Sequence, residues 1–214
     1  MEALDRVYGT GELLVRLWRL ARLDAFKSKY RLFMQYEAKA TILHSYAISV
    51  PGLLQTEDFA RVVLSSSPTP ISPDELEEAV AARLGRQELL KRFRPPGIRI
   101  ILDESALRRP ALDAGIWHAQ LARIAEAAEA PHMAIQVLPF AAGVHNLMGG
   151  SLSILWMADG SAVAHLEGNK SGELIEEPEE IARYRLSYDR LRDAALQPSD
   201  SAAFIRQLVE DSRP

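Results

Sequence analysis

The chain has 214 residues, a formal net charge of −4 at pH 7, 48% hydrophobic residues and 25% charged residues. These values are typical of a globular protein with one large domain or two small ones. The acidic balance argues against a general electrostatic attraction to nucleic acid or to an anionic membrane. The sequence has no cysteine, which excludes disulfides, thiolate catalysis and cysteine-bound zinc. No apolar run approaches the roughly 20 residues of a membrane span, and no signal-peptide pattern opens the chain. We therefore expect a soluble, cytoplasmic protein without membrane contact.

The first 40 residues have a helical pattern. Leu13, Leu17 and Leu20 recur at helical spacing within residues 11–26, and a second helix is expected over residues 28–40. We expect this segment, residues 1–40, to pack on a main domain formed by residues 41–214. Its apolar helices suit a homodimer interface, or equally contacts with a domain that this sequence does not include.

The next segment, SYAISVPGLLQTEDFARVVL (residues 45–64), joins a strand to a helix. Residues 41–49 are rich in β-branched and aromatic side chains, which predicts a strand that ends at Pro51-Gly52. Thr56 is the expected N-cap of the following helix, because Glu57 and Asp58 come directly after it. The polar Gln55 between apolar neighbours has no such local explanation.

The remaining elements alternate between helices and strands. Ser72, Pro73 and Glu75 form a capping-box pattern that predicts a helix start. The turn at Ala158-Asp159-Gly160 predicts a hairpin, and the acidic run from Glu173 to Glu180 is interpreted as the start of a helix. Further segments are expected as strands over 98–104 and 132–140, and as helices over 113–129, from 178 onward, and from Pro198, with Ser199 as N-cap, to near Val209. The predicted fold class is α+β, with a mixed or mainly antiparallel sheet flanked by helices and with helical N- and C-terminal segments.

Sequence motifs for common chemistries are missing. Neither a G-x-G-x-x-G loop, a Walker loop nor a G-x-S-x-G elbow occurs, and the histidines are scattered without metal-ligand spacing. We therefore expect no metal and no cofactor. The basic residues Arg83, Arg86 and Arg92 are interpreted as a solvated helix face.

Several polar residues near strand ends are candidates for binding. Asp103 is better explained as a helix N-cap, whereas a structural role and a ligand role are equally supported for Glu104 and Arg109. His145 lies in a glycine-bounded loop, where binding residues often occur, although a backbone hydrogen bond would explain it as well. Glu167 follows a predicted strand and is either a ligand contact or a solvated carboxylate.

The sequence YEAKATILHSYAISVPGLLQTEDFARVVL (residues 36–64) resembles a segment of a large actinobacterial family. These proteins are helix-turn-helix regulators of the Cro/repressor (Xre) type that carry a C-terminal domain of unknown function. The similarity continues through ARLGRQELL, LDESALRRP, IQVLPFAAGVH and EEPEEIARYRLSYDRLRDAAL, and so covers nearly the whole chain. The chain departs from the family pattern at His44, at Phe59 and in the loop after Glu167.

The resemblance implies a role in gene regulation. We expect an effector- or partner-binding domain whose DNA contact depends on a helix-turn-helix that this sequence does not contain; its partner is a small molecule or a small protein. The alternatives are a stand-alone enzyme, a hydrolase or group transferase acting on an anionic small molecule, and a protein-interaction module. A single pocket at the strand ends is the hypothesis for the site, with these ligand-binding candidates: Tyr46, Gln55, Glu57, Glu104, Arg109, His145 and Glu167.

Overall fold

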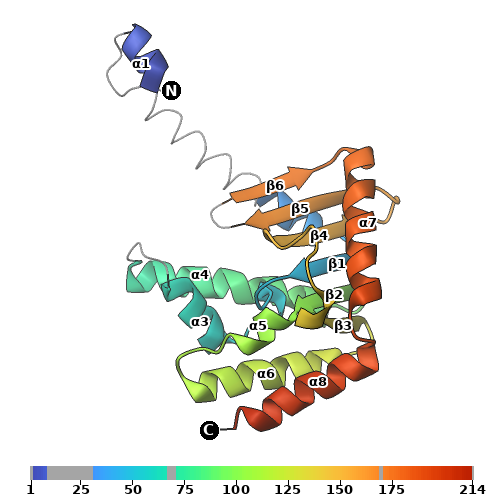
Figure 1. Cartoon of the computed structure of the whole chain (residues 1–214). Coiled ribbons are helices and arrows are strands. Elements are labelled where there is room, and N and C mark those ends of the chain that lie inside the picture. Colours follow the sequence, from blue (N-terminus) through green and yellow to red (C-terminus); the bar gives the residue numbers. More distant parts are fainter. Residues whose placement is uncertain (1, 9–30, 67–70, 169–170, 214) are drawn as a thin grey trace.

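A computed structural model describes residues 2–8, 31–66, 71–168 and 171–213 (Figure 1). In this part of the chain the strands form a six-stranded mixed sheet of order β3-β2-β1-β4-β5-β6. β1 (Ile42–Ala47), β2 (Gly97–Asp103) and β3 (Met133–Leu138) run parallel, and β4 (Ser151–Trp156), β5 (Ala162–Gly168) and β6 (Ser171–Ile175) add antiparallel pairings. The predicted α+β class with a mixed sheet is confirmed.

Helices cover both faces of the sheet. The described part of the chain contains helices α1 (Glu2–Tyr8), α3 (Glu57–Ser65), α4 (Pro73–Arg86), α5 (Glu104–Arg108), α6 (Ala114–Ala128), α7 (Pro178–Ala194) and α8 (Pro198–Asp211), and residues 31–37 are also helical. One core joins Leu43 and Ile100 of the sheet to Leu121 of α6 and Ile205 of α8. The other core lies on the opposite face, where Tyr46, Ile101 and Ile154 meet Ile181, Tyr188 and Leu191 of α7. Period-2 alternation along each strand sends neighbouring side chains to these two cores.

The edge of the sheet at β3 is covered by the junction between α7 and α8. β3 is an edge strand, and its unpaired backbone groups would be open to other strands. Leu196 N donates to Val137 O at 2.9 Å, and Ser201 Oγ accepts from Val137 N at 3.0 Å. The junction between α7 and α8 therefore satisfies this edge from within the chain.

The local start signals are confirmed by the observed caps. Thr56 accepts from Phe59 N, Ser72 forms both bonds of the capping box, and Asp103 accepts from Ser105 N. β4 and β5 form the hairpin predicted at Ala158-Asp159-Gly160. These signals act over a few residues, so the sequence alone reveals them.

Two predictions near the C-terminus are wrong. The run from Glu173 to Glu180 was expected as an acidic helix start, but residues 173–175 belong to β6, because Leu174 and Ile175 pair with β5 and reach the sheet cores. Helix α7 begins only at Pro178. The last helix has Gln197 rather than Ser199 as N-cap and extends to Asp211. The helix expected over residues 11–26 lies outside the described residues. Residues 31–37 are packed on the sheet through Phe33, and the boundary at residue 40 stays a prediction.

Candidate functional site

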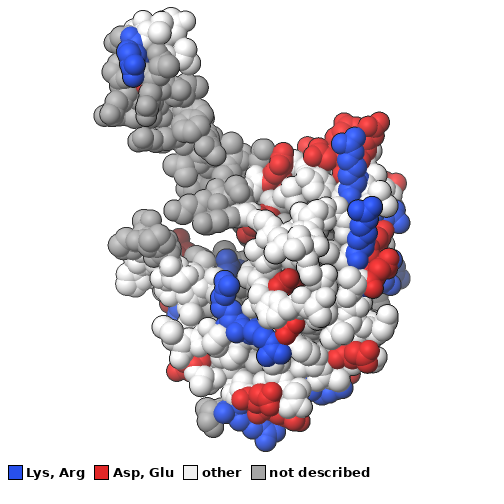
Figure 2. Space-filling model, in the orientation of Figure 1, with Lys and Arg blue, Asp and Glu red and all other residues white. Residues whose placement is uncertain are grey.

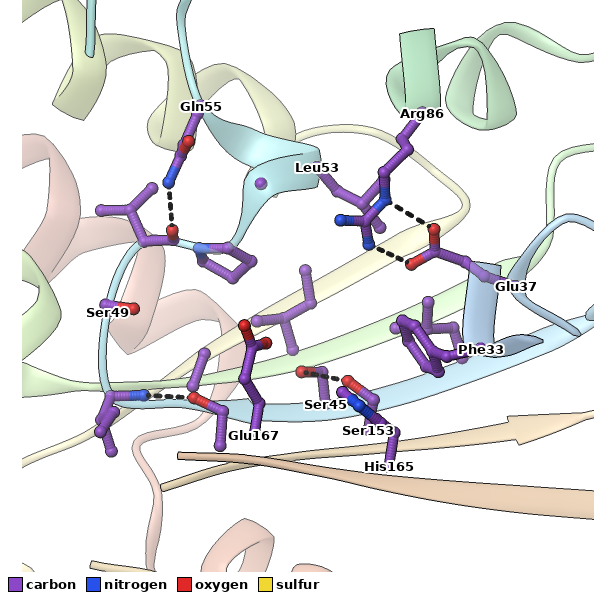
Figure 3. A pocket seen from close by; sticks show the side chains of 18 of the residues that line it. Phe33, Glu37, Ser45, Ser49, Leu53, Gln55, Arg86, Ser153, His165 and Glu167 are labelled. Atoms are coloured by element: carbon purple, nitrogen blue, oxygen red, sulfur yellow. Dashed lines mark hydrogen bonds and ion pairs between the residues drawn. The ribbon is translucent and has the colours of Figure 1, made fainter. Parts of the chain in front are cut away.

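A cleft of about 460 Å³ opens at the carboxyl ends of β1 and β5 (Figure 3). Its floor is the α6-facing side of the sheet. One wall is the turn from Val50 to Gln55, including the 3₁₀ turn η1 (Gly52–Leu54), and further walls come from α4 and from helical residues 31–37. The volume lies within the range of roughly 300–1,000 Å³ that small-molecule sites occupy.

Small polar side chains form the floor of the cleft. The register places Ser45 of β1 opposite Ser153 of β4, and Ser153 opposite His165 of β5, all on the same face. The hydroxyls of Ser45 and Ser153 are 3.4 Å apart, and Ser151 Oγ accepts from Ile48 N at 3.3 Å. Interior sheet positions normally carry branched apolar side chains that fill the space above them. Serine leaves that space empty and adds hydroxyls, so this row accounts for both the volume and the polarity of the cleft.

Three glutamine side chains form hydrogen bonds with the backbone of the Val50–Gln55 turn, which is one wall of the cleft. Gln55 Nε2 donates to Val50 O at 2.8 Å, which closes the turn around Pro51-Gly52. Gln87 Nε2 donates to the carbonyls of Gly52 and Gln55. The fully buried Gln120 donates to Leu54 O and accepts from Thr56 N, both at 2.8 Å. Gln55 is thus explained by the backbone groups of an irregular buried segment, which need partners because water is excluded.

Two arginines of α4 extend toward the cleft. Arg86 makes a bidentate ion pair with Glu37, with Nε–Oε2 at 2.9 Å and Nη2–Oε1 at 2.8 Å. Arg83 Nη1 donates to Gln55 Oε1 at 2.9 Å. The interpretation of Arg83 and Arg86 as a solvated face is therefore wrong: both side chains tie α4 to other walls of the cleft.

His165 forms the inner end of the floor. Its ring is 3% exposed and stacks on Phe33 with centroids 4.5 Å apart. Burial, together with the nearby Arg86 charge, lowers the pKa of His165 to about 4. The imidazole is therefore neutral at pH 7, and the aromatic pair presents no charge to the cleft.

The acid sensitivity of the fold is expected to depend on two histidines. Burial also lowers the pKa of His44, which stacks on Tyr188, to about 4. Between pH 6.5 and 4 the unfolded chain binds protons on these rings that the folded chain does not, so the free energy of unfolding falls as the pH is lowered through this window. Urea unfolding from pH 7 to pH 4 measures this slope. The double variant His44→Leu, His165→Leu should flatten it, and an unchanged slope would contradict the assignment.

A second polar cluster lies on the opposite, α7-facing side of the sheet. The hydroxyl of the buried Tyr46 donates to Asp103 Oδ2 at 3.1 Å and lies 3.2 Å from His145 Nε2. Leu147 N donates to His145 Nδ1 at 3.2 Å, so the ring carries its proton on Nε2 in this arrangement. Burial, followed by the charge of Asp103 and its hydrogen bond, raises the pKa of Tyr46. Glu104 secures the same loop, because Oε2 accepts from Phe140 N at 2.8 Å and Oε1 pairs with Arg108.

The seven candidate residues thus fall into separate places instead of one pocket. Gln55 and Glu167 line the cleft. Tyr46 and His145 meet on the other face, and Glu104 anchors their loop. The remaining two candidates are exposed and lie apart from both clusters. Glu57 forms an ion pair with Arg61 at 2.9 Å on the surface of α3, and Arg109 is the C-cap of α5.

The cleft also contains residues that the sequence did not indicate as a site. Phe33, Glu37, Ser45, Ser153 and His165 come from separate segments, and none of them was a candidate for binding. Alternation along β1, β4 and β5 could have suggested the serines and His165, since these residues occupy inward positions of otherwise apolar strands.

Comparison with known proteins places the chain in a family. A family model described as a domain of unknown function (DUF5753) matches residues 30–207. The chain belongs to the DUF5753 family. The match includes the whole sheet and every wall of the cleft, so the cleft is a feature of the DUF5753 domain of this chain. Neither a curated protein nor a solved structure matches the chain.

Three further observations concern the described residues. In this part of the chain no group of three or more histidine, aspartate or glutamate side chains is placed to hold a metal ion. Among the same residues, no helix has both the length and the apolar character that a membrane span requires. On the face shown in Figure 2, acidic and basic side chains are interspersed rather than gathered by sign.

Proposed function

We propose that this DUF5753 domain is the effector-binding half of a cytoplasmic helix-turn-helix regulator of the Xre type, and that the cleft binds the effector. The observation that carries the proposal is the row of Ser45, Ser153 and His165 on the sheet floor. A folding core gains nothing from polar groups there, because burying them costs free energy. A ligand that hydrogen-bonds to them recovers that cost.

The state of the charged groups favours binding over catalysis. Arg86 is paired with Glu37, and Arg83 is bonded to Gln55. The neutral, buried His165 is stacked on Phe33. General acid–base chemistry needs a titrating group within reach of the substrate and near the working pH, and a histidine with a pKa of about 4 does not meet this condition. His165 therefore does not support the enzyme hypothesis.

The position of the cleft provides a route to regulation. Phe33 and Glu37 belong to the helical residues 31–37, which lie near the C-terminal end of the N-terminal segment, residues 1–40. In the regulators that this chain resembles, the DNA-binding part precedes this segment. A ligand touching Phe33 or Glu37 would bias the position of that helix, and differential contact of this kind is what an effector needs in order to shift an equilibrium.

Native mass spectrometry tests the proposal first. The purified chain is measured directly from cells and again after denaturation. A mass that is bound under native conditions and lost on denaturation supports an effector and gives its chemical class. A chain of unchanged mass argues against a tightly held small molecule and favours the partner-protein alternative, which a pull-down then tests.

A cleft-filling variant locates the site. Ser153→Leu places a large apolar side chain on the cleft floor, so we expect the retained mass to disappear, with a loss of affinity of at least about tenfold. The matched control is Ser199→Leu on the exposed start of α8, which should retain the ligand. Retention by the Ser153 variant would place the ligand elsewhere on the chain.

A further inference from the structure

The chemical class of the ligand can be inferred from the polar groups of the cleft that can still form hydrogen bonds or ion pairs with a ligand. This step rests on the proposed function. Serine hydroxyls each offer one donor and two acceptor lone pairs. Ser45, Ser49, Ser151 and Ser153 all line the cleft, and the one contact between two of them is long, at 3.4 Å. A partner that both donates and accepts, such as a ligand hydroxyl, suits this lining.

Glu167 provides a negative charge in the cleft that can pair with a ligand. Its side chain extends from β5 into the open space between the turn that carries Leu53 and Gln55 and the Ser45–Ser153 pair (Figure 3). It is exposed and makes no ion pair with another residue of the described ranges. The other carboxylate of the lining, Glu37, is 4% exposed and holds Arg86 through both oxygens. Glu167 is therefore the carboxylate that a ligand entering the cleft would meet.

The basic groups of the lining are directed at the protein itself. The charge of Arg86 is balanced by Glu37 within 2.9 Å, and Arg83 donates to Gln55 at the wall. His165 at the inner end is neutral at pH 7 and stacked on Phe33. An anionic ligand would have to displace these bonds and would face Glu167, whereas a cationic ligand displaces none of them.

We infer that the cleft binds a hydroxylated amine: a small molecule whose protonated amino group pairs with Glu167 and whose hydroxyls bond to the serine floor. An ammonium group near a partly exposed carboxylate gives modest affinity, and the hydroxyl contacts give orientation. The hydrocarbon part of such a ligand would lie against Leu53 and Pro51, which line the same cleft.

Three probes that share a pyranose ring and differ in charge test this inference: glucosamine, glucose and glucuronate. Binding to the full chain is followed by NMR chemical-shift titration at pH 7. We expect glucosamine to bind about fivefold to tenfold more tightly than glucose, and glucuronate to bind most weakly. Added salt should reduce the preference for glucosamine.

Matched variants assign the preference to one residue. Glu167→Gln should bind glucosamine and glucose equally. Glu173→Gln removes the same charge from the neighbouring strand, on the face that carries Ile175 rather than the cleft, and should keep the wild-type order. Equal binding of glucosamine and glucose by the wild type, a preference for glucuronate, or no binding of glucosamine at millimolar concentration would overturn the inference. The effector proposal has its own test, because a neutral or acidic molecule found by native mass spectrometry would support the cleft as a binding site while refuting the amine.

Discussion

Arg86→Met is expected to lower the free energy of unfolding by about 3–5 kcal/mol. The Glu37 side chain is 6% exposed and that of Arg86 is 16% exposed, so the pair is largely shielded from water. Removing the guanidinium leaves a buried carboxylate whose two hydrogen bonds, at 2.8 and 2.9 Å, are lost together. The cost is that of an uncompensated buried charge rather than that of one ion pair. Urea unfolding followed by circular dichroism measures the change.

The double variant Glu37→Leu, Arg86→Met is the control. With both charges replaced by apolar groups of similar volume, no unpaired charge is left, and most of the lost stability should return. If the double variant were as unstable as the single one, packing of the long Arg86 side chain, and not the charge pair, would explain the loss. Lys91→Met on the exposed end of η2 (Gln87–Lys91) should change stability by less than about 0.5 kcal/mol, because its pair with Glu88 is solvent-exposed.

Gly150→Ala is expected to destabilise the fold by about 1–3 kcal/mol. A Cβ at this position would collide with the main-chain carbonyl oxygen of Glu167 and would lie 3.2 Å from the carbonyl carbon of the same residue. Neither backbone can move freely, because Ser151 and Glu167 are paired partners in the β4–β5 ladder. The strain would fall at the end of β5 that positions Glu167 at the cleft. Thermal and urea unfolding measure the loss.

The neighbouring Gly149 gives a matched control. A Cβ there meets no atom within 4 Å, and the residue does not have a positive φ, so Gly149→Ala should be neutral within about 0.5 kcal/mol or slightly stabilising. Equal losses for the two variants would show that loop flexibility, rather than the approach of the Glu167 carbonyl, explains the glycine pair.

The sequence by itself determined the local features of this protein. Capping at Thr56, Ser72 and Asp103, the Asp159-Gly160 hairpin and the α+β class all depend on patterns a few residues long, and the structure has them where they were predicted. The end of the first strand before Pro51-Gly52 was also predicted from the sequence. Such signals are readable because the atoms that interact are close along the chain.

Only the tertiary structure decided the site. The partners that build it are distant in sequence: Glu37 and Arg86 are 49 residues apart, and Ser45 and Ser153 are 108 residues apart. Alternation along the strands placed Tyr46, which contacts His145, on the face opposite Glu167, although all three residues lie near strand ends. Strand pairing likewise placed residues 173–175 in β6, although the acidic run from Glu173 to Glu180 had predicted a helix start. Strand register and pairing depend on packing between residues that are far apart in the sequence. No local pattern in a single sequence shows these contacts, so the sequence alone could not show that the residues lining the cleft lie together.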